Sequence, residues 1–137
     1  MARPPQNQIG LDSVVNRSLR LTHEHEIRVA RGKGRAFADG PLVVRVLPRT
    51  LEECPNNRYA VIASKKVGKA HERNRCKRLV REALRTLHPN LKQGCHIVVI
   101  LRGGVAELPN FDVALASMER IARRARLLTE PVLDPPA

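Results

Sequence analysis

The sequence has very few aromatic side chains: no tryptophan, one tyrosine and two phenylalanines among 137 residues. Apolar residues make up 42% of the chain, so we expect it to fold around a mainly aliphatic core. This length suits one domain with a single modest core. No apolar run approaches the roughly 20 residues that a membrane helix requires, and the N-terminus lacks the apolar stretch of a signal peptide. We therefore expect a cytoplasmic protein with no membrane partner.

Cysteine and carboxylates are scarce and are not arranged for metal binding. Cys54, Cys76 and Cys95 include no CxxC pair and no Cys/His pattern with zinc-ligand spacing, so they are predicted to be reduced thiols. Cys76 and Cys95 are expected in the core. The 13 acidic residues form no cluster that would hold a metal ion or supply a general acid and base. The residues therefore argue against an independent nuclease and predict no cofactor held by the protein.

Positive charge is what the sequence has in excess, with 25 lysines and arginines and a net charge of +12. Such an excess repels itself in a compact protein, and a polyanion relieves the repulsion. Nucleic acid is the commonest such partner, because cations neutralise phosphates and release counterions. Arginine outnumbers lysine, which favours bidentate phosphate contacts and stacking on bases. An anionic membrane surface is the rival polyanion.

Periodicity and turn residues divide the chain into one domain, residues 21–128, between flexible tails at residues 1–20 and 129–137. Seven elements are expected in the domain. They are a helix capped by Thr22 and stopped by Gly32 and Gly34, strands at 35–39, 42–47 and 58–64, a helix at 70–87, a strand at 96–101, and a helix capped by Asn110. The order α-β-β-β-α-β-α predicts an α+β fold, with three helices packed on a mixed four-stranded sheet.

The helix predicted at residues 70–87 carries the strongest functional signal. At about 100° per residue, one side collects the apolar residues Cys76, Leu79, Val80, Ala83 and Leu87. The opposite side collects Asn74, Arg78, Arg81 and Arg85, flanked by Arg73, Arg75 and Lys77. A solvated face usually mixes charges, because opposite charges three or four residues apart stabilise a helix. Here like charges stand at those spacings, which favours a polyphosphate partner over a solvated face or a membrane-surface helix.

Just upstream, the segment Ser64-Lys65-Lys66-Val67-Gly68-Lys69 leads from a strand into this helix. Gly68 permits a tight turn, and the helix start presents free N–H groups. Two lysines and a hydroxyl beside that positive pole are typical of a phosphate site.

These segments resemble the core motif of the bacterial ribonuclease P protein family. The resemblance is carried by residues 64–70 and by Arg73-Asn74-Arg75-Cys76-Lys77-Arg78-Leu79-Val80-Arg81-Glu82-Ala83, and extends more weakly over residues 21–128. It implies a left-handed β-α-β crossover, which periodicity alone does not give. It also implies that the holoenzyme removes the 5′ leader of precursor tRNA, with Mg²⁺ in the catalytic RNA and one protein per RNA. A non-enzymatic RNA chaperone or a ribosome-associated protein is the alternative.

The resemblance also implies two sets of RNA contacts. The catalytic RNA is expected to meet Arg73, Asn74, Arg75, Lys77, Arg78, Arg81 and Arg85. The leader is expected between the first helix and the sheet, contacted by Ile27, Arg31, Phe37, Arg45, Ser64, Lys65 and Lys66. Where family members usually carry rings, this sequence has Ile27, Arg31 and Arg45, and Phe37 is the only aromatic nearby. We hypothesise that Arg31 and Arg45 replace a ring with a guanidinium plane and a charge, so that the cleft binds phosphates more than bases.

Overall fold

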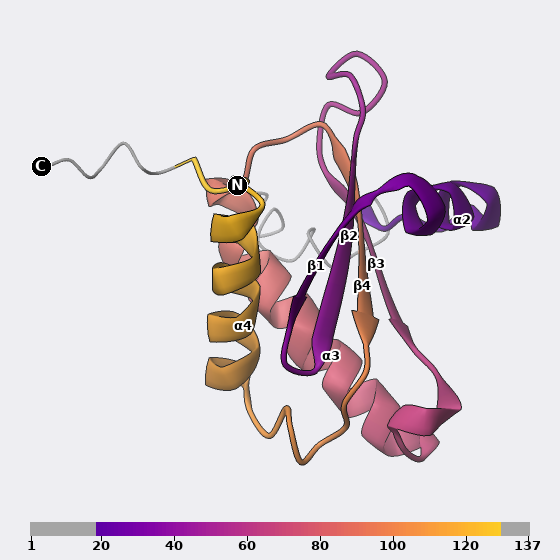
Figure 1. Cartoon of the computed structure of the whole chain (residues 1–137), viewed down its shortest axis with the longest axis vertical. Coiled ribbons are helices and arrows are strands. Elements are labelled where there is room, and N and C mark those ends of the chain that lie inside the picture. Colours follow the sequence, from indigo (N-terminus) through magenta and orange to yellow (C-terminus); the bar gives the residue numbers. More distant parts are fainter. Residues whose placement is uncertain (1–18, 130–137) are drawn as a thin grey trace, which may run out of the picture.

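A computed structural model describes residues 19–129, and its elements follow the predicted order (Figure 1). In chain order they are α2 (Glu24–Lys33), β1 (Arg35–Asp39), β2 (Leu42–Pro48), β3 (Arg58–Ala63), the 3-10 turn η2 (Lys65–Val67), α3 (Ala70–Leu87), the 3-10 turn η3 (His88–Asn90), β4 (Cys95–Leu101) and α4 (Phe111–Arg124). Three helices and a four-stranded mixed sheet confirm the predicted fold class.

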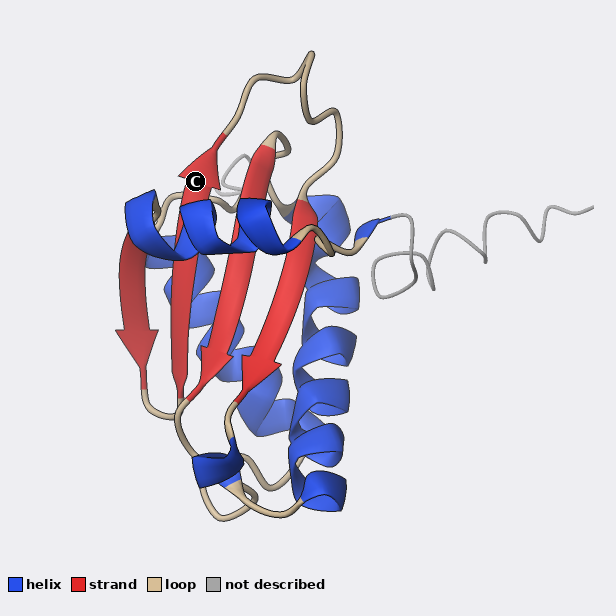
Figure 2. Ribbon diagram, turned by 90° about the vertical axis from the view of Figure 1, so that its right-hand side faces the viewer, coloured by secondary structure: helices blue, strands red, loops and turns tan. Residues whose placement is uncertain are grey.

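The strands form one sheet in the order β1-β2-β4-β3. The β1–β2 and β2–β4 pairs are antiparallel, and the β3–β4 pair is parallel. Because α3 connects the two parallel strands, β3, α3 and β4 make a crossover unit. Seen with α3 in front and both strands pointing up, the chain moves leftward from β3 to β4 (Figures 1 and 2). The crossover is therefore left-handed, as the resemblance implied and against the usual rule.

The two faces of the sheet are covered unequally. On one face, alternate strand residues such as Val44 and Val99 pack with α3 and α4 into the main core. On the other face, Val98 joins a smaller core with Ala30 of α2. Figure 2 shows α2 lying across one part of this second face, while the rest carries no helix. The resemblance places the leader between α2 and this face of the sheet.

The bounds of α3 are those predicted from the sequence. Its apolar stripe is buried at Cys76, Val80, Ala83 and Leu87 and half-buried at Leu79, and Leu84 is an additional buried member. Gly68, just before the helix, has a φ of 150°, which other residues rarely adopt. The Lys69 backbone N–H then donates to Glu72 Oε1 at 2.8 Å, which satisfies one free donor of the first turn.

The helix α4 begins as predicted after Asn110, whose side-chain oxygen accepts from the Val113 backbone N–H at 3.0 Å. On its apolar face, Met118, Ala122 and Ala125 are buried, while Phe111 and Leu115 are half-buried. This face closes the main core beside α3.

The ends of the domain and of α2 differ from the predictions. The inner ends of the predicted tails are ordered, because Arg20 pairs with Tyr59 and the Thr129 backbone N–H donates to the Asn90 carbonyl at 2.8 Å; the remainder of both tails lies outside the described residues. The helix is preceded by His23 rather than Thr22, and it continues through Gly32 to Lys33. The stop is Gly34 alone, where a Cβ would lie 2.5 Å from the Ala30 carbonyl oxygen.

Candidate RNA interface

The seven residues predicted to contact the catalytic RNA lie on the outer side of α3 and along its flanks. Asn74, Arg75 and Arg78 are exposed, whereas Arg73, Lys77, Arg81 and Arg85 are half-buried. We call these seven residues the α3 cationic face. The helical period turns the apolar stripe toward the sheet and leaves Asn74, Arg78, Arg81 and Arg85 outside, with the other three residues on the flanks.

Two arginines of the α3 cationic face hold the loops at its N-terminal end. Arg73 Nη1 donates to the Gly68 carbonyl at 2.9 Å, and Arg75 Nη2 donates to the Pro109 carbonyl at 2.7 Å. Each guanidinium has five N–H donors, so both retain donors for a phosphate. These bonds therefore orient the two side chains without using up their binding capacity.

Arg20, which is predicted from the sequence to lie in the N-terminal tail, adds positive charge farther along α3. The bridge between Arg20 and Tyr59 brings Arg20 beside α3, where it lines a groove with Asn74, Arg78, Arg81 and Glu82. Burial and the charge of Arg20 lower the pKa of Arg81. Burial, and then Arg81, Arg73 and Arg20, lower the pKa of Lys77. These cations repel one another in the free protein, and a bound anion would relieve the repulsion.

Arg85 is held differently from the rest of the α3 cationic face. Its guanidinium forms an ion pair with Glu82, three residues earlier on the same helix. Within residues 19–129 it is the only member of that face with an ion pair inside 4.0 Å. The other five cations thus keep their full charge for a partner.

The predicted leader contacts on α2 lie in two adjoining hollows. Ile27 and Arg31 share a surface groove with Glu24, Arg28 and Gly32. Ile27 also lines a cleft between α2, β3 and α3, together with Arg20, Leu21, Thr22, the β3 residues from Tyr59 to Ile62, Arg81 and Leu84. The structure therefore brings the two predicted contact sets together at Arg81, which belongs to both the α3 groove and the α2 cleft.

On the sheet, the predicted leader residues Arg45 and Phe37 point to opposite faces. Arg45 pairs across strands with Val98 on the face that α2 partly covers, and its Nε is buried without a hydrogen-bond partner among the described residues. Phe37 pairs with Val44, packs against the main core and lies under Arg35, whose Cζ is 5.0 Å from the ring centroid. Phe37 therefore does not join Arg45 in one cleft, contrary to the expectation from sequence.

Ser64, Lys65 and Lys66 lie at the end of β3, where the chain turns into α3. Ser64 Oγ accepts from the Lys66 backbone N–H at 3.3 Å, which caps η2, and all three residues are exposed. They adjoin the start of the α3 cationic face and do not line the hollows beside α2.

The three cysteines are unpaired thiols, and all are buried. No group of three or more His, Cys, Asp or Glu side chains in the described residues could hold a metal ion. None of the helices between residues 19 and 129 is long and apolar enough to cross a membrane.

Fold and charge together define a small basic α+β protein whose exposed helix face suits a polyanion. A family model described as Ribonuclease P matches residues 15–126, and the chain belongs to the family of the bacterial ribonuclease P protein component. The protein component from Caldanaerobacter subterraneus is 33% identical over 111 residues, covering 81% of this chain and 92% of that protein. The one from Dehalococcoides mccartyi is 43% identical over 105 residues, covering 76% and 78%.

Solved structures agree with this assignment. The ribonuclease P protein of Staphylococcus aureus matches with a TM-score of 0.70 and 25% identity, covering 82% of this chain and 99% of that one. The protein from Thermotoga maritima matches with a TM-score of 0.66 and 25% identity, covering 77% and 96%. Ribonuclease P is a tRNA-processing endoribonuclease, and the family is that of its protein component.

Proposed function

We propose that this protein binds the catalytic RNA of ribonuclease P through the α3 cationic face. The observation that carries the proposal is the crowding of Lys77 and Arg81 beside Arg20. Burial and the neighbouring cations lower the pKa of Lys77 and of Arg81, and neither side chain has an ion pair within residues 19–129. Such a cluster of like charges is unfavourable in the free protein and favourable against phosphates. Asn74, exposed within the same groove, can donate and accept, which suits a sugar or base edge.

The 5′ leader of precursor tRNA is proposed to lie over the hollows beside α2 and the open sheet surface. Ile27, Arg31 and Arg45 are its contacts there, while Ser64, Lys65 and Lys66 meet the leader or the catalytic RNA near the start of α3. The place of the half-buried Arg45 on the sheet face that α2 partly covers supports this assignment, because a guanidinium there suits a phosphate. Since Arg81 belongs to both hollows, it would sit between the catalytic RNA and the leader.

Phosphodiester hydrolysis is proposed to belong to Mg²⁺ held by the RNA, with one protein per RNA in the cytoplasm. Protein-based hydrolysis needs positioned carboxylates or a general base, and the few acidic residues of this face serve other partners: Glu82 binds Arg85 and Glu72 caps α3. The protein's part is to neutralise phosphate repulsion between the catalytic RNA and its substrate.

Reconstitution tests the proposal. The purified protein is added to a bacterial ribonuclease P RNA at low Mg²⁺, and cleavage of precursor tRNA is measured. We expect strong rescue with the protein and no cleavage by the protein alone. An RNA chaperone or a ribosome-associated protein would leave cleavage unchanged, and that outcome would reject the proposal.

Removing charge from α3 tests whether the catalytic RNA binds the α3 cationic face. Arg78→Gln combined with Arg81→Gln should weaken binding to the catalytic RNA and lower the slope of log affinity against log salt by about 1 per lost phosphate contact. Arg49→Gln combined with Arg58→Gln removes the same charge at the ends of the β2–β3 loop and serves as the matched control. Equal effects from the two pairs would mean that only net charge matters, and would refute a specific α3 interface.

The leader contacts are tested with precursor tRNA and with mature tRNA that lacks a leader. Arg31→Ala and Arg45→Ala should weaken holoenzyme binding of the precursor and reduce its salt dependence, while leaving the mature form unaffected. Arg45→Lys keeps the charge but loses the guanidinium plane, so it separates phosphate attraction from stacking. The leader assignment is wrong if neither alanine variant changes precursor affinity or its salt slope relative to Arg49→Ala.

A further inference from the structure

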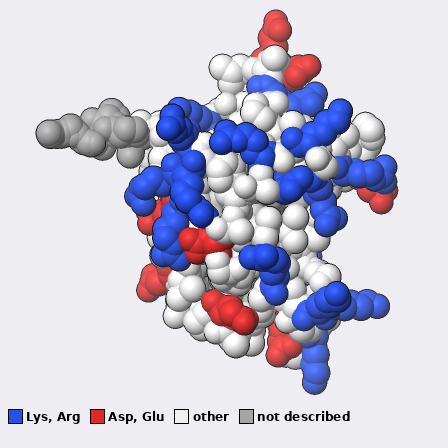
Figure 3. All heavy atoms as spheres, in the orientation of Figure 1, with Lys and Arg blue, Asp and Glu red and all other residues white. Residues whose placement is uncertain are grey.

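The C-terminal end of α4 carries a second concentration of arginine, apart from the α3 cationic face. Arg120, Arg123, Arg124 and Arg126 fall within seven residues that contain no acidic residue, and all four are exposed. We call them the α4 arginine patch. In Figure 3, basic side chains gather over this end of α4 on the left of the molecule. Neither lysine nor histidine contributes to the patch.

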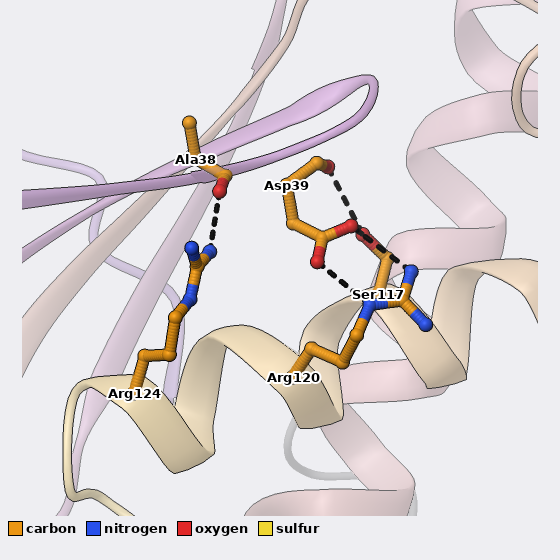
Figure 4. A network of polar contacts seen from close by, with 5 residues as sticks. All are labelled: Ala38, Asp39, Ser117, Arg120 and Arg124. Carbon is orange, nitrogen blue, oxygen red and sulfur yellow. Dashed lines mark hydrogen bonds and ion pairs between the residues drawn. The ribbon is translucent and has the colours of Figure 1, made fainter.

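Contacts with β1 fix two members of this patch in place. Arg120 Nε and Nη2 donate to the two carboxylate oxygens of Asp39 at 2.7 and 2.9 Å, and Arg124 donates to the Ala38 carbonyl (Figure 4). The Ser117 hydroxyl, buried on α4, donates to Asp39 as well. Arg120 keeps three N–H donors and Arg124 keeps four. The two guanidiniums are thus oriented before any ligand arrives, which lowers the entropy cost of binding.

Helix stability explains only part of this arrangement. Cations in the last turn interact favourably with the helix dipole, which accounts for Arg123 and Arg124. It does not account for Arg120, one turn earlier, or for Arg126, beyond the helix end. Asp39 neutralises one charge of the four, and neither Arg123 nor Arg126 has a side-chain hydrogen bond or ion pair within residues 19–129.

The α4 arginine patch and Arg81 of the α3 cationic face lie against opposite edges of the sheet. Arg120 and Arg124 bind β1, whereas Arg81 lines the cleft beside β3. In the order β1-β2-β4-β3, three inter-strand spacings separate these edges, a distance of roughly 14 Å. A phosphate bound at Arg81 therefore cannot also contact Arg120.

We propose that the α4 arginine patch binds the phosphate backbone of a second RNA segment, distinct from the segment that meets α3. Arginine alone, with orienting bonds that leave donors free, suits bidentate phosphate contact. This inference rests on the proposed function, because the second segment belongs to the same ribonucleoprotein. The protein then acts as a bridge that holds two phosphate backbones near opposite edges of its sheet.

The first test compares charge-matched variants of the full chain for affinity to a bacterial ribonuclease P RNA. Arg123→Gln combined with Arg126→Gln removes two exposed side chains that make no hydrogen bond or ion pair within residues 19–129, so folding should be unchanged; thermal unfolding checks this. We expect weaker binding and a salt slope lower by about 1 per lost phosphate contact. The Arg49→Gln and Arg58→Gln pair is the control. If the α4 pair matches the control, the patch does not bind this RNA, whatever other polyanion it meets.

The second test places a hydroxyl-radical probe on single introduced cysteines, which is selective because the three native cysteines are buried. Glu119→Cys lies beside the α4 arginine patch, and Thr86→Cys lies at the exposed end of α3. We expect cleavage of two different RNA regions from the two positions. Cleavage of one shared RNA region, or no cleavage from position 119, would overturn the proposal that the α4 arginine patch binds a second RNA segment.

The two proposals fail in different ways. If the wild-type protein neither binds the RNA nor rescues cleavage, the proposed function fails. If the wild type and the Arg78→Gln, Arg81→Gln variant behave as expected while the α4 pair behaves like the control, only the α4 inference fails.

Discussion

At the scale of single residues, the buried amide of Asn57 holds the end of the sheet where β3 and β4 begin. Its Nδ2 donates to the Lys92 carbonyl at 2.8 Å and to the Tyr59 hydroxyl at 3.3 Å. Its Oδ1 accepts from the Cys95 backbone N–H at 2.8 Å. Since Asn57 is fully buried, water could not take its place as the hydrogen-bond partner of these groups. The amide therefore joins β3 and β4 by hydrogen bonds in place of backbone pairing, at the point where their regular pairing starts.

Asn57→Ala should destabilise the protein by about 2–4 kcal/mol, because it leaves a buried N–H and a buried carbonyl without partners. Urea unfolding at pH 7 measures the change. Asn56→Ala is the matched control, since Asn56 is exposed and its side chain makes no hydrogen bond within residues 19–129; its effect should stay within about 0.5 kcal/mol. A loss below about 1 kcal/mol for Asn57→Ala would contradict this role.

His88 makes the stability depend on pH. Its Nδ1 lies 2.6 Å from the Tyr59 hydroxyl, and burial lowers the pKa of His88 below its ordinary value of 6.5. The unfolded chain therefore takes up a proton more readily than the folded protein, so the free energy of unfolding should fall as the pH drops from 6.5 toward the folded pKa. Urea unfolding between pH 7 and pH 5 measures this fall.

His88→Gln tests this explanation, because it should reduce the fall in the free energy of unfolding between pH 7 and pH 5. The remainder is expected from His96, whose pKa burial also lowers. A wild-type stability that is constant between pH 7 and pH 5 would rule out the linkage.

At the scale of secondary-structure elements, the sequence predicts an element well when its own side chains decide it. The bounds of α3 were predicted correctly because its apolar stripe and the glycine before it are both local signals. The start of α2 was predicted wrongly because a distant contact decides it. The Leu21 backbone N–H donates to the Tyr59 carbonyl at 2.7 Å, which keeps the chain extended along β3 past Thr22, so that the helix begins only after His23.

Gly68→Ala tests the turn that leads into α3. At a φ of 150° an alanine is strained, and its Cβ would lie 2.6 Å from Glu72 Oε1, the acceptor that caps the helix. We expect a loss of about 1–3 kcal/mol in the free energy of unfolding, with weaker RNA binding because Arg73 is bonded to this turn.

Gly32→Ala is the matched control for that substitution. Gly32 lies within α2, and an added Cβ would meet nothing within 4 Å. This change should stabilise the protein by about 0.4–1 kcal/mol. Opposite signs for the two variants are therefore expected, and a neutral Gly68→Ala would show that the turn conformation is not required.

At the scale of the whole molecule, the candidate site was predictable where it lies on one helix and not where the tertiary fold assembles it. The helical period alone groups the outer residues of the α3 cationic face, because they lie on one helix. Phe37 was grouped with Arg45, yet their positions relative to Val44 put them on opposite faces of the sheet. Arg20 was assigned to a tail because only its pairing with Tyr59 brings it beside Arg81. The handedness of the crossover came from the resemblance, since both hands satisfy the same periodicity.

Net charge governs the last prediction, which concerns the stability of the free protein. The chain carries +12, while the ion pairs Arg49–Glu53, Arg85–Glu82 and Arg120–Asp39 each have at least one side chain more than a third exposed. Salt therefore screens more repulsion than attraction. Raising NaCl from about 10 to 200 mM shortens the screening length from roughly 30 Å to below 10 Å, so the urea midpoint should rise.

Phosphate at the same ionic strength should raise that midpoint further, because it binds the folded protein at clustered arginines and stabilises it by mass action. Arg78→Gln combined with Arg81→Gln should lose much of this extra gain, since it removes part of the crowded cluster on α3, whereas Arg49→Gln combined with Arg58→Gln should keep it. A midpoint that falls with NaCl would mean that ion pairs outweigh repulsion. Equal midpoints in chloride and phosphate would mean that the arginine clusters do not bind phosphate in the free protein.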